Sequence, residues 1–534
     1  MKNIIETDVL VIGGGMAGCF AAIKAKEKGV DVILVDKGYV SRSGQSPFAG
    51  VFSAFNPESG NDLDACMAHI NKGGEYVNNR DWTEIVFKES LNRYEDLRGW
   101  GLEEQEMNRP QGMPNRPRPA MPPCDMKHLG WRNFATLLRK QCKEIGVNIM
   151  DRIMVTDLIK QDGRISGATG ISIEKDDFYI FKAGAVVLCT GAGGFRPPGW
   201  PISELTADGH IMAYRIGAPI TGKEFVDPHS TSLEFPAHFG HIMTKGGPMH
   251  GTRYNALGEE IQNLGGLFIN LEFLAHEGKA PITQKFPDGG QLTRVGGAAS
   301  GMSAHCTEGL WPEGTDCSTE IPGLYAAGDA LGRMQLGATY CRTGLALAGA
   351  AVSGALAGES SGEFAKANGD VKIDMDQVGK IKADNFSPLE RKGGFSPRWV
   401  TQQLQNIMIP YFIMYIKNEE RMTAALTLVE FIKDHLAPKL TAKDPHELRL
   451  ALETKNMILN AEMRLRSSLF RTESRGCHYR EDFPRRDDDN WLAWVLLKEE
   501  DGEMKMIKKD IPEEWKPDPS IPYEEKYPIR LPGE

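Results

Sequence analysis

The sequence lacks the cysteine patterns of metal-binding and disulfide-rich proteins. Nine of its 534 residues are cysteine, and no two of them form a Cys-x-x-Cys pair. Iron–sulfur clusters and structural zinc ions are usually held by such pairs, so we predict no metal site in this chain. An odd number of scattered cysteines favours reduced thiols, most of them packed in the core of a cytoplasmic protein.

Long apolar runs are also missing. The longest candidate, residues 407–416, is interrupted by Pro410. It falls short of the ~18 apolar residues that a membrane-spanning helix requires. Residues 1–8 contain no apolar segment of the kind that forms a secretory signal peptide. We therefore expect neither a membrane span nor a secretion signal.

An excess of positive charge is missing too. The 62 lysine and arginine residues are outnumbered by 72 acidic ones, which gives a net charge of -10 at pH 7. This balance disfavours nucleic acid as the main partner. Hydrophobic residues make up 41% of the chain and charged residues 25%, as in globular proteins. The chain is too long for one ordinary core, so two or three domains are expected.

The first forty residues contain the signature of a dinucleotide-binding turn. A β-branched apolar run, residues 8–12, leads into Gly-x-Gly-x-x-Gly at Gly13, Gly15 and Gly18. These glycines would allow a tight turn, close approach to a pyrophosphate, and close packing of helix on strand. The phosphates would bind the free N–H groups at the start of the helix. A second strand ends at Asp36, where a carboxylate can accept hydrogen bonds from ribose hydroxyls.

The loop after the second strand, residues 41–51, resembles the flavin loop of the fumarate reductase and succinate dehydrogenase flavoprotein family. That family also includes L-aspartate oxidase and the α subunit of adenylylsulfate reductase. In its quinone-linked members the loop reads Arg-Ser-His, and the His is bonded covalently to FAD. Here Arg42 and Ser43 are followed by Gly44. Because glycine offers no imidazole for that bond, the resemblance implies FAD that is bound tightly but non-covalently.

Later segments match the same family. Residues 184–194 match its second nucleotide-side strand, and residues 206–209 resemble its Thr-Gly-Asp-Gly. Residues 321–329, Ile-Pro-Gly-Leu-Tyr-Ala-Ala-Gly-Asp, are typical of two-domain FAD proteins. The most specific match is residues 469–492, which follow the family pattern Arg-x-Glu-Ser-Arg-Gly-Ala-His and its continuation. The resemblance extends over about residues 5–495.

The glycine turn and the family resemblance together predict a set of residues that contact FAD. In chain order these are Gly13, Gly15, Met16, Ala17, Gly18, Asp36, Lys37, Ser43, Gly44, Gln45, Ala49, Gly50, Thr190, Gly191, Asp208, Gly328, Asp329 and Leu345. The resemblance assigns Asp329 to the ribityl chain. It also implies that a helix starting at Leu345 points its N-terminus at the flavin, where the helix dipole would stabilise negative charge on the reduced ring.

The resemblance also implies a substrate site between a capping domain and the flavin. His229 aligns with a family histidine near substrate and flavin, and His305 takes the place of a substrate-binding histidine. The family arginine that donates a proton in fumarate reduction falls at Gly247, so it is missing from its place. His250 and Arg253 are the candidates to replace it, and either could equally be an exposed loop residue. A second family arginine falls at Tyr340, and Arg342 could recover its role only with a two-residue shift.

The expected fold is α/β. It comprises a Rossmann-like FAD-binding domain with an inserted α+β capping domain and a C-terminal helical domain. The expected boundaries are 1–221 and 321–360 for the two parts of the FAD-binding domain, 222–320 for the capping domain, 361–495 for the helical domain and 496–534 for an extended tail. Apolar spacing also predicts a helix over 128–143 and a strand over 148–154.

The predicted function is that of an FAD-dependent oxidoreductase, with hydride transfer through flavin N5 to or from an unsaturated or saturated organic acid or a related acceptor. Two alternatives remain open: an adenylylsulfate-reductase-like catalytic subunit, and an electron-transfer flavoprotein without a substrate of its own. L-aspartate oxidase is disfavoured, because the arginines that hold its dicarboxylate are displaced here. Since the chain shows no cluster motif, we expect an iron–sulfur protein as its electron-transfer partner, besides a small-molecule substrate.

Overall fold

The computed structural model describes residues 4–103, 124–129, 133–196, 202–226, 252–261, 279, 282–285, 289–294, 307–531 and 533–534. Its centre is a seven-stranded sheet in the order β5-β2-β1-β8-β7-β6, with β14 paired to β8. The bounds are β1 Ile4–Ile12, β2 Val32–Asp36, β5 Asn148–Asp151, β6 Ile153–Gln161, β7 Arg164–Ser172, β8 Phe178–Leu188 and β14 Leu324–Ala326. Strands β1, β2, β5, β8 and β14 run parallel, whereas β7 pairs antiparallel with β8 on one side and with β6 on the other.

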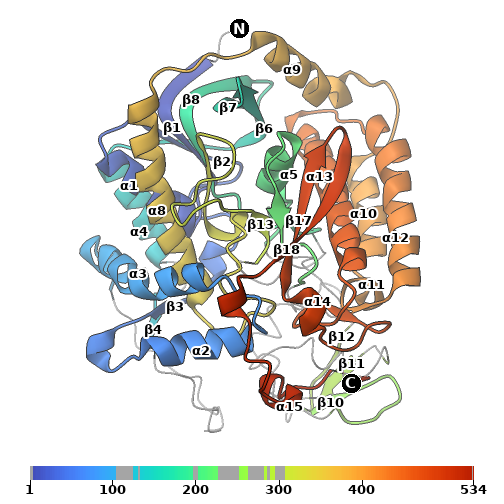
Figure 1. Cartoon of the computed structure of the whole chain (residues 1–534). Helices are drawn as coiled ribbons and strands as arrows, with labels where there is room; N and C mark the ends of the chain where they lie inside the picture. The colour runs from blue at the N-terminus through green and yellow to red at the C-terminus, as the bar shows by residue number, and fades with distance from the viewer. Residues whose placement is uncertain are drawn as a thin grey trace.

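Two helices pack against each other beside this sheet, α1 (Met16–Glu27) and α8 (Leu345–Asn368) (Figure 1). Glycines of α8 bring the two backbones into contact. A Cβ added at Gly354 would lie 2.4 Å from the carbonyl oxygen of Ala17, and one at Gly358 would lie 2.3 Å from that of Ala21. The small residues on both helices therefore set how closely α8 approaches the turn that precedes α1.

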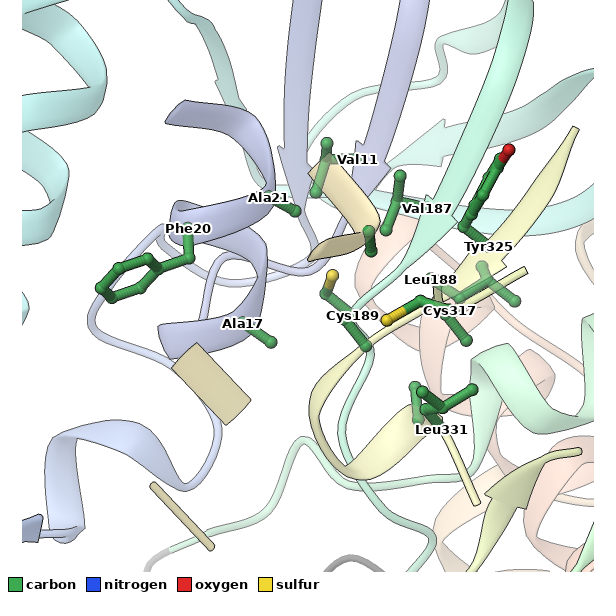
Figure 2. Close-up of a cluster of buried hydrophobic side chains, with 14 of the residues drawn as sticks. Val11, Ala17, Phe20, Ala21, Val187, Leu188, Cys189, Cys317, Tyr325 and Leu331 are labelled. Carbon is green, nitrogen blue, oxygen red and sulfur yellow. The ribbon is translucent and has the colours of Figure 1, made fainter. Parts of the chain in front are cut away.

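The main hydrophobic core lies between these helices and the sheet. Figure 2 shows side chains from α1, β1, β8 and β14 gathered there, among them Val11, Ala21, Val187 and Tyr325. Burying such side chains stabilises each by roughly 1.5–3 kcal/mol. The flanking helices are α2 Leu63–Gly73, α3 Arg80–Gly99 and α4 Asn133–Glu144, and the small sheet near them pairs β3 Val51–Ala54 with β4 Asp125–His128.

A second sheet joins segments that are distant in sequence. Its order is β13-β9-β17-β18, with bounds β9 Ile220–Thr221, β13 Gly309–Leu310, β17 Ala493–Glu500 and β18 Glu503–Asp510. A smaller antiparallel sheet consists of β10 Thr252–Tyr254, β11 Ile282–Lys285 and β12 Gln291–Arg294. The C-terminal hairpin thus pairs through β17 with β9, just before the predicted capping segment, and β9 pairs in turn with β13 near the end of that segment.

A bundle of helices forms the other side of the molecule (Figure 1). It contains α9 Met375–Glu390, α10 Pro397–Met408, α11 Tyr411–Met414, α12 Glu419–Phe431 and α13 Pro445–Phe470. The short elements nearby and beyond it are β15 Ile416–Lys417, β16 Tyr479–Arg480, α14 Asp488–Trp491 and α15 Tyr523–Lys526. None of the described helices has both the length and the hydropathy that crossing a bilayer requires.

Three sequence predictions need correction. The helix predicted over 128–143 begins at Asn133 within the described residues, and His128 lies in β4. The strand predicted over 148–154 is interrupted at Arg152, whose positive φ of 64° separates β5 from β6. The tail predicted to be extended from residue 496 begins inside β17, and β17 and β18 form a hydrogen-bonded hairpin up to Asp510.

Candidate FAD site

The predicted FAD residues gather at one edge of the central sheet. Strands β1, β2, β8 and β14 are parallel, so their carboxyl ends meet at the same edge. Gly13 directly follows β1, Lys37 follows β2, and Thr190 and Gly328 lie within two residues of the ends of β8 and β14. In open parallel sheets this edge is where ligands bind.

The turn between β1 and α1 is closed by its glycines. Gly13 has φ +103°, and a Cβ there would lie 2.3 Å from the carbonyl oxygen of Cys189. A Cβ at Gly18 would lie 1.8 Å from the carbonyl oxygen of Gly13, so the first turn of α1 rests on the strand end. A side chain at either position would force the turn open, which makes the glycine pattern a requirement of this geometry.

The predicted flavin loop folds over the start of α1. The N–H of Met16 donates to Oγ of Ser46 at 2.9 Å, and no side chain caps the helix at Gly15. Gly44 has φ +71°, and a Cβ there would meet no atom within 4 Å. The helix start therefore has backbone N–H groups available for an anion, and Gly44 adjoins open space.

Asp36 lies at the end of β2, and its carboxylate is tied to the backbone. Oδ2 accepts the N–H of Gly14 and Oδ1 accepts the N–H of Gly38, both at 2.7 Å. Burial raises the pKa of Asp36, and the two backbone bonds oppose that shift. Each carboxylate oxygen has a second lone pair, so a ribose hydroxyl can still donate to it.

Lys37 and Asp208, predicted from separate motifs, are bonded to each other. Nζ of Lys37 lies 2.7 Å from Oδ2 of Asp208 and 2.9 Å from Oε1 of Glu453 on α13. Burial works against the charged lysine, but the two carboxylates outweigh it and raise the pKa of Lys37. Asp208 opens α5 (Asp208–Arg215) and also accepts from Nδ2 of Asn456 at 2.9 Å. These contacts join the sheet edge to the helical bundle.

Two buried polar atoms at this edge fit a missing ligand. Among the residues that the structure describes, Oγ1 of Thr190 and Nη2 of Arg333 have no hydrogen-bond partner. Nη1 of Arg333 donates to the carbonyl oxygen of Gly328 at 2.6 Å. Unpaired buried polar groups cost free energy, and the hydroxyl, carbonyl and phosphate groups of FAD are suitable partners for them. The residues present thus fit an FAD molecule.

Comparison with known proteins supports the predicted resemblance. Residues 8–262 match the model of an FAD binding domain, and residues 401–524 match that of the fumarate reductase flavoprotein C-terminus. An uncharacterised FAD-dependent oxidoreductase of Methanocaldococcus jannaschii is 28% identical over 92% of this chain and 96% of its own. A chain of the CoM/CoB fumarate reductase of Methanothermobacter marburgensis is 25% identical over 93% of this chain and 98% of its own. The predicted resemblance to fumarate reductase and succinate dehydrogenase flavoproteins is confirmed over most of the chain.

Solved structures show the same fold. The FrdA chain of E. coli quinol fumarate reductase matches with a TM-score of 0.79 at 20% identity, over 95% of this chain and 97% of its own. An adenylylsulfate reductase chain from Archaeoglobus fulgidus matches with a TM-score of 0.74 at 22% identity, over 96% of each chain. The predicted α/β fold with an FAD-binding domain and a C-terminal domain is confirmed, as are FAD as cofactor and the class of FAD-dependent oxidoreductase.

Sequence reasoning missed a buried network of charged and polar side chains next to the predicted FAD site. Nζ of Lys223 lies 3.0 Å from Oε2 of Glu308, 3.0 Å from Nδ1 of His210 and 2.8 Å from Oδ1 of Asn460. Nη2 of Arg464 contacts the same Glu308 oxygen at 2.8 Å. These side chains come from separate segments, so no local pattern brings them together. The only signal was the placement of charged residues inside glycine-rich apolar stretches.

Burial shifts the pKa values of this network. It lowers the pKa of His210 to about 3, with Lys223 adding to the effect. It also lowers the pKa of Lys223 to about 8, although Glu308 opposes this. His210 is thus neutral at pH 7, accepts from Lys223, and has its Nε2 3.3 Å from the carbonyl oxygen of Asp329. The network therefore contacts the backbone of a predicted ribityl-binding residue.

Helix α8 begins where the sequence predicts. Gly344 precedes it with φ +89°, no side chain caps it, and Leu345 is its first residue and is buried. A Cβ at Gly344 would lie 2.8 Å from the backbone nitrogen of Ser53 in β3. The uncapped N-terminus of a 24-residue helix thus lies against the strand that follows the flavin loop, a favourable place for negative charge.

The predicted catalytic residues are only partly described. Arg342 is 3% exposed, and its charge acts on His69 and Cys66 of α2. His229, His250 and His305 lie outside the described residues. The loops that follow β2 and β8 contain four further predicted FAD residues, Gln45, Ala49, Gly50 and Gly191. Within the described chain, no group of three or more His, Cys, Asp or Glu side chains is arranged to hold a metal ion.

Proposed function

We propose that this protein binds FAD non-covalently and transfers hydride between flavin N5 and an organic acid or a related acceptor. The observation that carries the proposal is the convergence of four strand ends, the glycine turn and the starts of α1 and α8 at one edge. FAD supplies hydride transfer when bound. The relatives that match over more than nine-tenths of this chain include a fumarate reductase subunit.

Non-covalent binding follows from the chemistry of the flavin loop. The position after Ser43 is Gly44, and a covalent histidyl link would need a nucleophilic imidazole there. We propose instead that backbone N–H groups at the start of α1 hold the pyrophosphate, and that Asp36 accepts from a ribose hydroxyl. Thr190 and Arg333 would give their unpaired polar atoms to the cofactor.

We assign substrate polarisation to His229 and His305, and the proton donor to His250 or Arg342. Imidazole and guanidinium groups can stabilise developing negative charge on an acid substrate and pass it a proton. Gly247 stands where the family has its arginine, so the preferred substrate is expected to differ from fumarate in size or charge. The burial of Arg342 supports a role in a closed site.

We further propose an iron–sulfur subunit for electron transfer, and a cytoplasmic location. The relatives include chains named as subunits of fumarate reductase and succinate dehydrogenase. The described cysteines are all free thiols, which suits a reducing compartment.

An anaerobic flavin reoxidation assay tests the function. The bound flavin is reduced chemically and mixed separately with fumarate, with larger α,β-unsaturated acids, and with adenylylsulfate, while the flavin absorbance is followed. The proposal expects rapid reoxidation by at least one unsaturated acid, with fumarate slower than the best substrate. Reoxidation by adenylylsulfate alone would favour the adenylylsulfate-reductase alternative. No reoxidation by any of them would contradict the proposal and favour an electron-transfer role.

A further inference from the structure

Two cysteines from different elements lie in contact beside the predicted site. Cys66 is on α2, and Cys124 directly precedes β4. Their Sγ atoms are 3.3 Å apart, within hydrogen-bond distance. Cys66 is 2% exposed, whereas Cys124 is partly exposed. The pair therefore joins a buried residue to a partly exposed one.

The surroundings shift the pKa values of the two thiols in opposite directions. The hydrogen bond from Cys124 lowers the pKa of Cys66, burial opposes this, and the Arg342 charge adds to the lowering. Bonding to Cys66 and burial raise the pKa of Cys124, while Arg342 opposes the rise. The other charges on the pair are the carboxylates of Asp62 and Asp125. A thiolate is the reactive form of cysteine, so Cys66 is prepared for attack on a neighbouring sulfur.

We propose that Cys66 and Cys124 are a redox-active pair that closes to a reversible disulfide when the protein meets a low-molecular-weight disulfide. The proposal is independent of the substrate of the enzyme. It assigns a covalent modification site to two residues outside the predicted FAD contacts.

The thiol–disulfide exchange proceeds in two steps. Cys124, the accessible sulfur, attacks one sulfur of the small disulfide, which forms a mixed disulfide and releases one small thiolate. Cys66 then loses its proton and attacks the Cys124 sulfur, which releases the second small thiolate. The two protons lost by the cysteines are taken up by the two released thiolates. Two electrons pass from the cysteine pair to the small disulfide, which is reduced to two thiols.

The position of the pair gives the bond a structural consequence. Strand β4 pairs with β3, and the N–H of Leu129, just past β4, donates to the carbonyl oxygen of Gly50 in the flavin loop at 2.9 Å. A disulfide would therefore tie α2 to the sheet that carries the end of that loop. It would also remove two titratable thiols that interact with the Arg342 charge, so the electrostatic surroundings of Arg342 change with the redox state.

A third cysteine, Cys341, also lies against α2. Sγ of Cys341 lies 3.1 Å from where a Cβ at Gly73 of α2 would be. Cys341 is buried, and burial raises the pKa of its thiol to about 12. We therefore expect it to stay reduced while the pair reacts.

The test uses the full-length, flavin-loaded protein and glutathione disulfide as the oxidant. Free thiols are counted after denaturation, and linked peptides are mapped by mass spectrometry. The proposal expects a fall from nine thiols per chain to seven, one linkage between the Cys66 and Cys124 peptides, and full reversal by dithiothreitol. The first step should quicken as pH rises, because the attacking Cys124 must lose its proton.

Variants and a matched pair provide the controls. In Cys66→Ser, the mixed glutathione adduct should persist on Cys124, because nothing resolves it. In Cys124→Ser, Cys66 should stay free, since it is buried. The matched pair is Cys19 and Cys142, which are both buried on neighbouring helices and should remain reduced. Nine free thiols after oxidation, or a linkage of Cys66 to Cys341, would overturn the proposal. Peptide mapping of the wild-type protein gives this answer even if a variant fails to fold.

Discussion

At the residue scale, the side-chain hydroxyl of Thr190 has no hydrogen-bond partner among the described residues. Its Oγ1 is buried, and it lies 2.1 Å from where a Cβ at Gly209 would be, which leaves it pressed against the start of α5. A buried hydroxyl without a hydrogen bond costs roughly 1–3 kcal/mol. The cost is removed if FAD provides the partner.

Thr190→Val tests this at the residue scale. We expect FAD affinity to fall by about tenfold, which corresponds to one hydrogen bond of roughly 1.4 kcal/mol, while the melting temperature of the FAD-free protein rises because the unpaired buried hydroxyl is gone. Thr206→Val is the matched control, because Oγ1 of Thr206 donates to Asp208 at 2.8 Å and its loss should destabilise the FAD-free protein. Unchanged FAD affinity in Thr190→Val, measured by fluorescence titration, would contradict the assignment.

At the scale of elements, the packing of α8 on α1 fixes the start of α8 against the FAD edge. The contact depends on glycines that let one backbone touch the other, since a Cβ at Gly358 would lie 2.3 Å from the Ala21 carbonyl oxygen. Helix interiors normally disfavour glycine by roughly 0.5–1 kcal/mol relative to alanine. Here the close approach reverses that preference.

Gly358→Ala should therefore destabilise the protein by roughly 1–3 kcal/mol, because the helices must move apart. Gly379→Ala provides the control on α9, where a Cβ meets nothing within 4 Å. That change should stabilise the protein by about 0.5–1 kcal/mol. Chemical denaturation of both variants measures the two changes in the free energy of unfolding. If both variants are stabilised, α1 and α8 do not pack as described.

The sequence predicted the elements that local chemistry specifies. The glycine turn, the start of α8 at Leu345 and the parallel strands all follow from patterns of a few adjacent residues. The Lys37–Asp208 pair and the network around Lys223 were not predicted, because their partners lie on segments far apart in the chain. The helix start at residue 128 was wrong because apolar spacing does not distinguish a short strand from the helix that follows it.

At the scale of the whole molecule, buried ion pairs hold the helical bundle to the FAD edge. Lys37 joins Asp208 on α5 to Glu453 on α13, and Glu453 is fully buried. Removing one partner of a buried pair leaves an uncompensated charge, at a cost of roughly 3–5 kcal/mol. Surface pairs contribute about 1 kcal/mol or less.

Lys37→Met should accordingly lower the free energy of unfolding by roughly 3 kcal/mol and weaken FAD binding. Lys28→Met removes only the exposed pair with Glu363 and should change stability by about 1 kcal/mol or less. Urea denaturation compares the two. A Lys37→Met variant as stable as Lys28→Met would mean that the pair does not hold the bundle to the sheet.

The stability of the whole protein should also depend on pH. His210 belongs to the network that joins α5, Glu308 and α13. Its pKa is about 3 in the folded protein, below the ordinary 6.5 of the unfolded chain. Between these values the unfolded chain binds more protons, so stability falls as pH drops from about 6.5 towards 3. His210→Gln should show a weaker loss between pH 7 and pH 5, measured by urea midpoints. An unchanged slope would show that His210 does not titrate in this way.

The central claim is that this chain holds FAD at the sheet edge without a covalent bond. The most direct measurement is to denature the purified yellow protein with acid, remove the precipitate, and identify the flavin in each fraction. The account predicts that all of the flavin appears in the supernatant, as FAD and not FMN, with one equivalent per chain. Flavin that remains on the precipitated protein, or a protein that carries no flavin and binds none on titration, would contradict it.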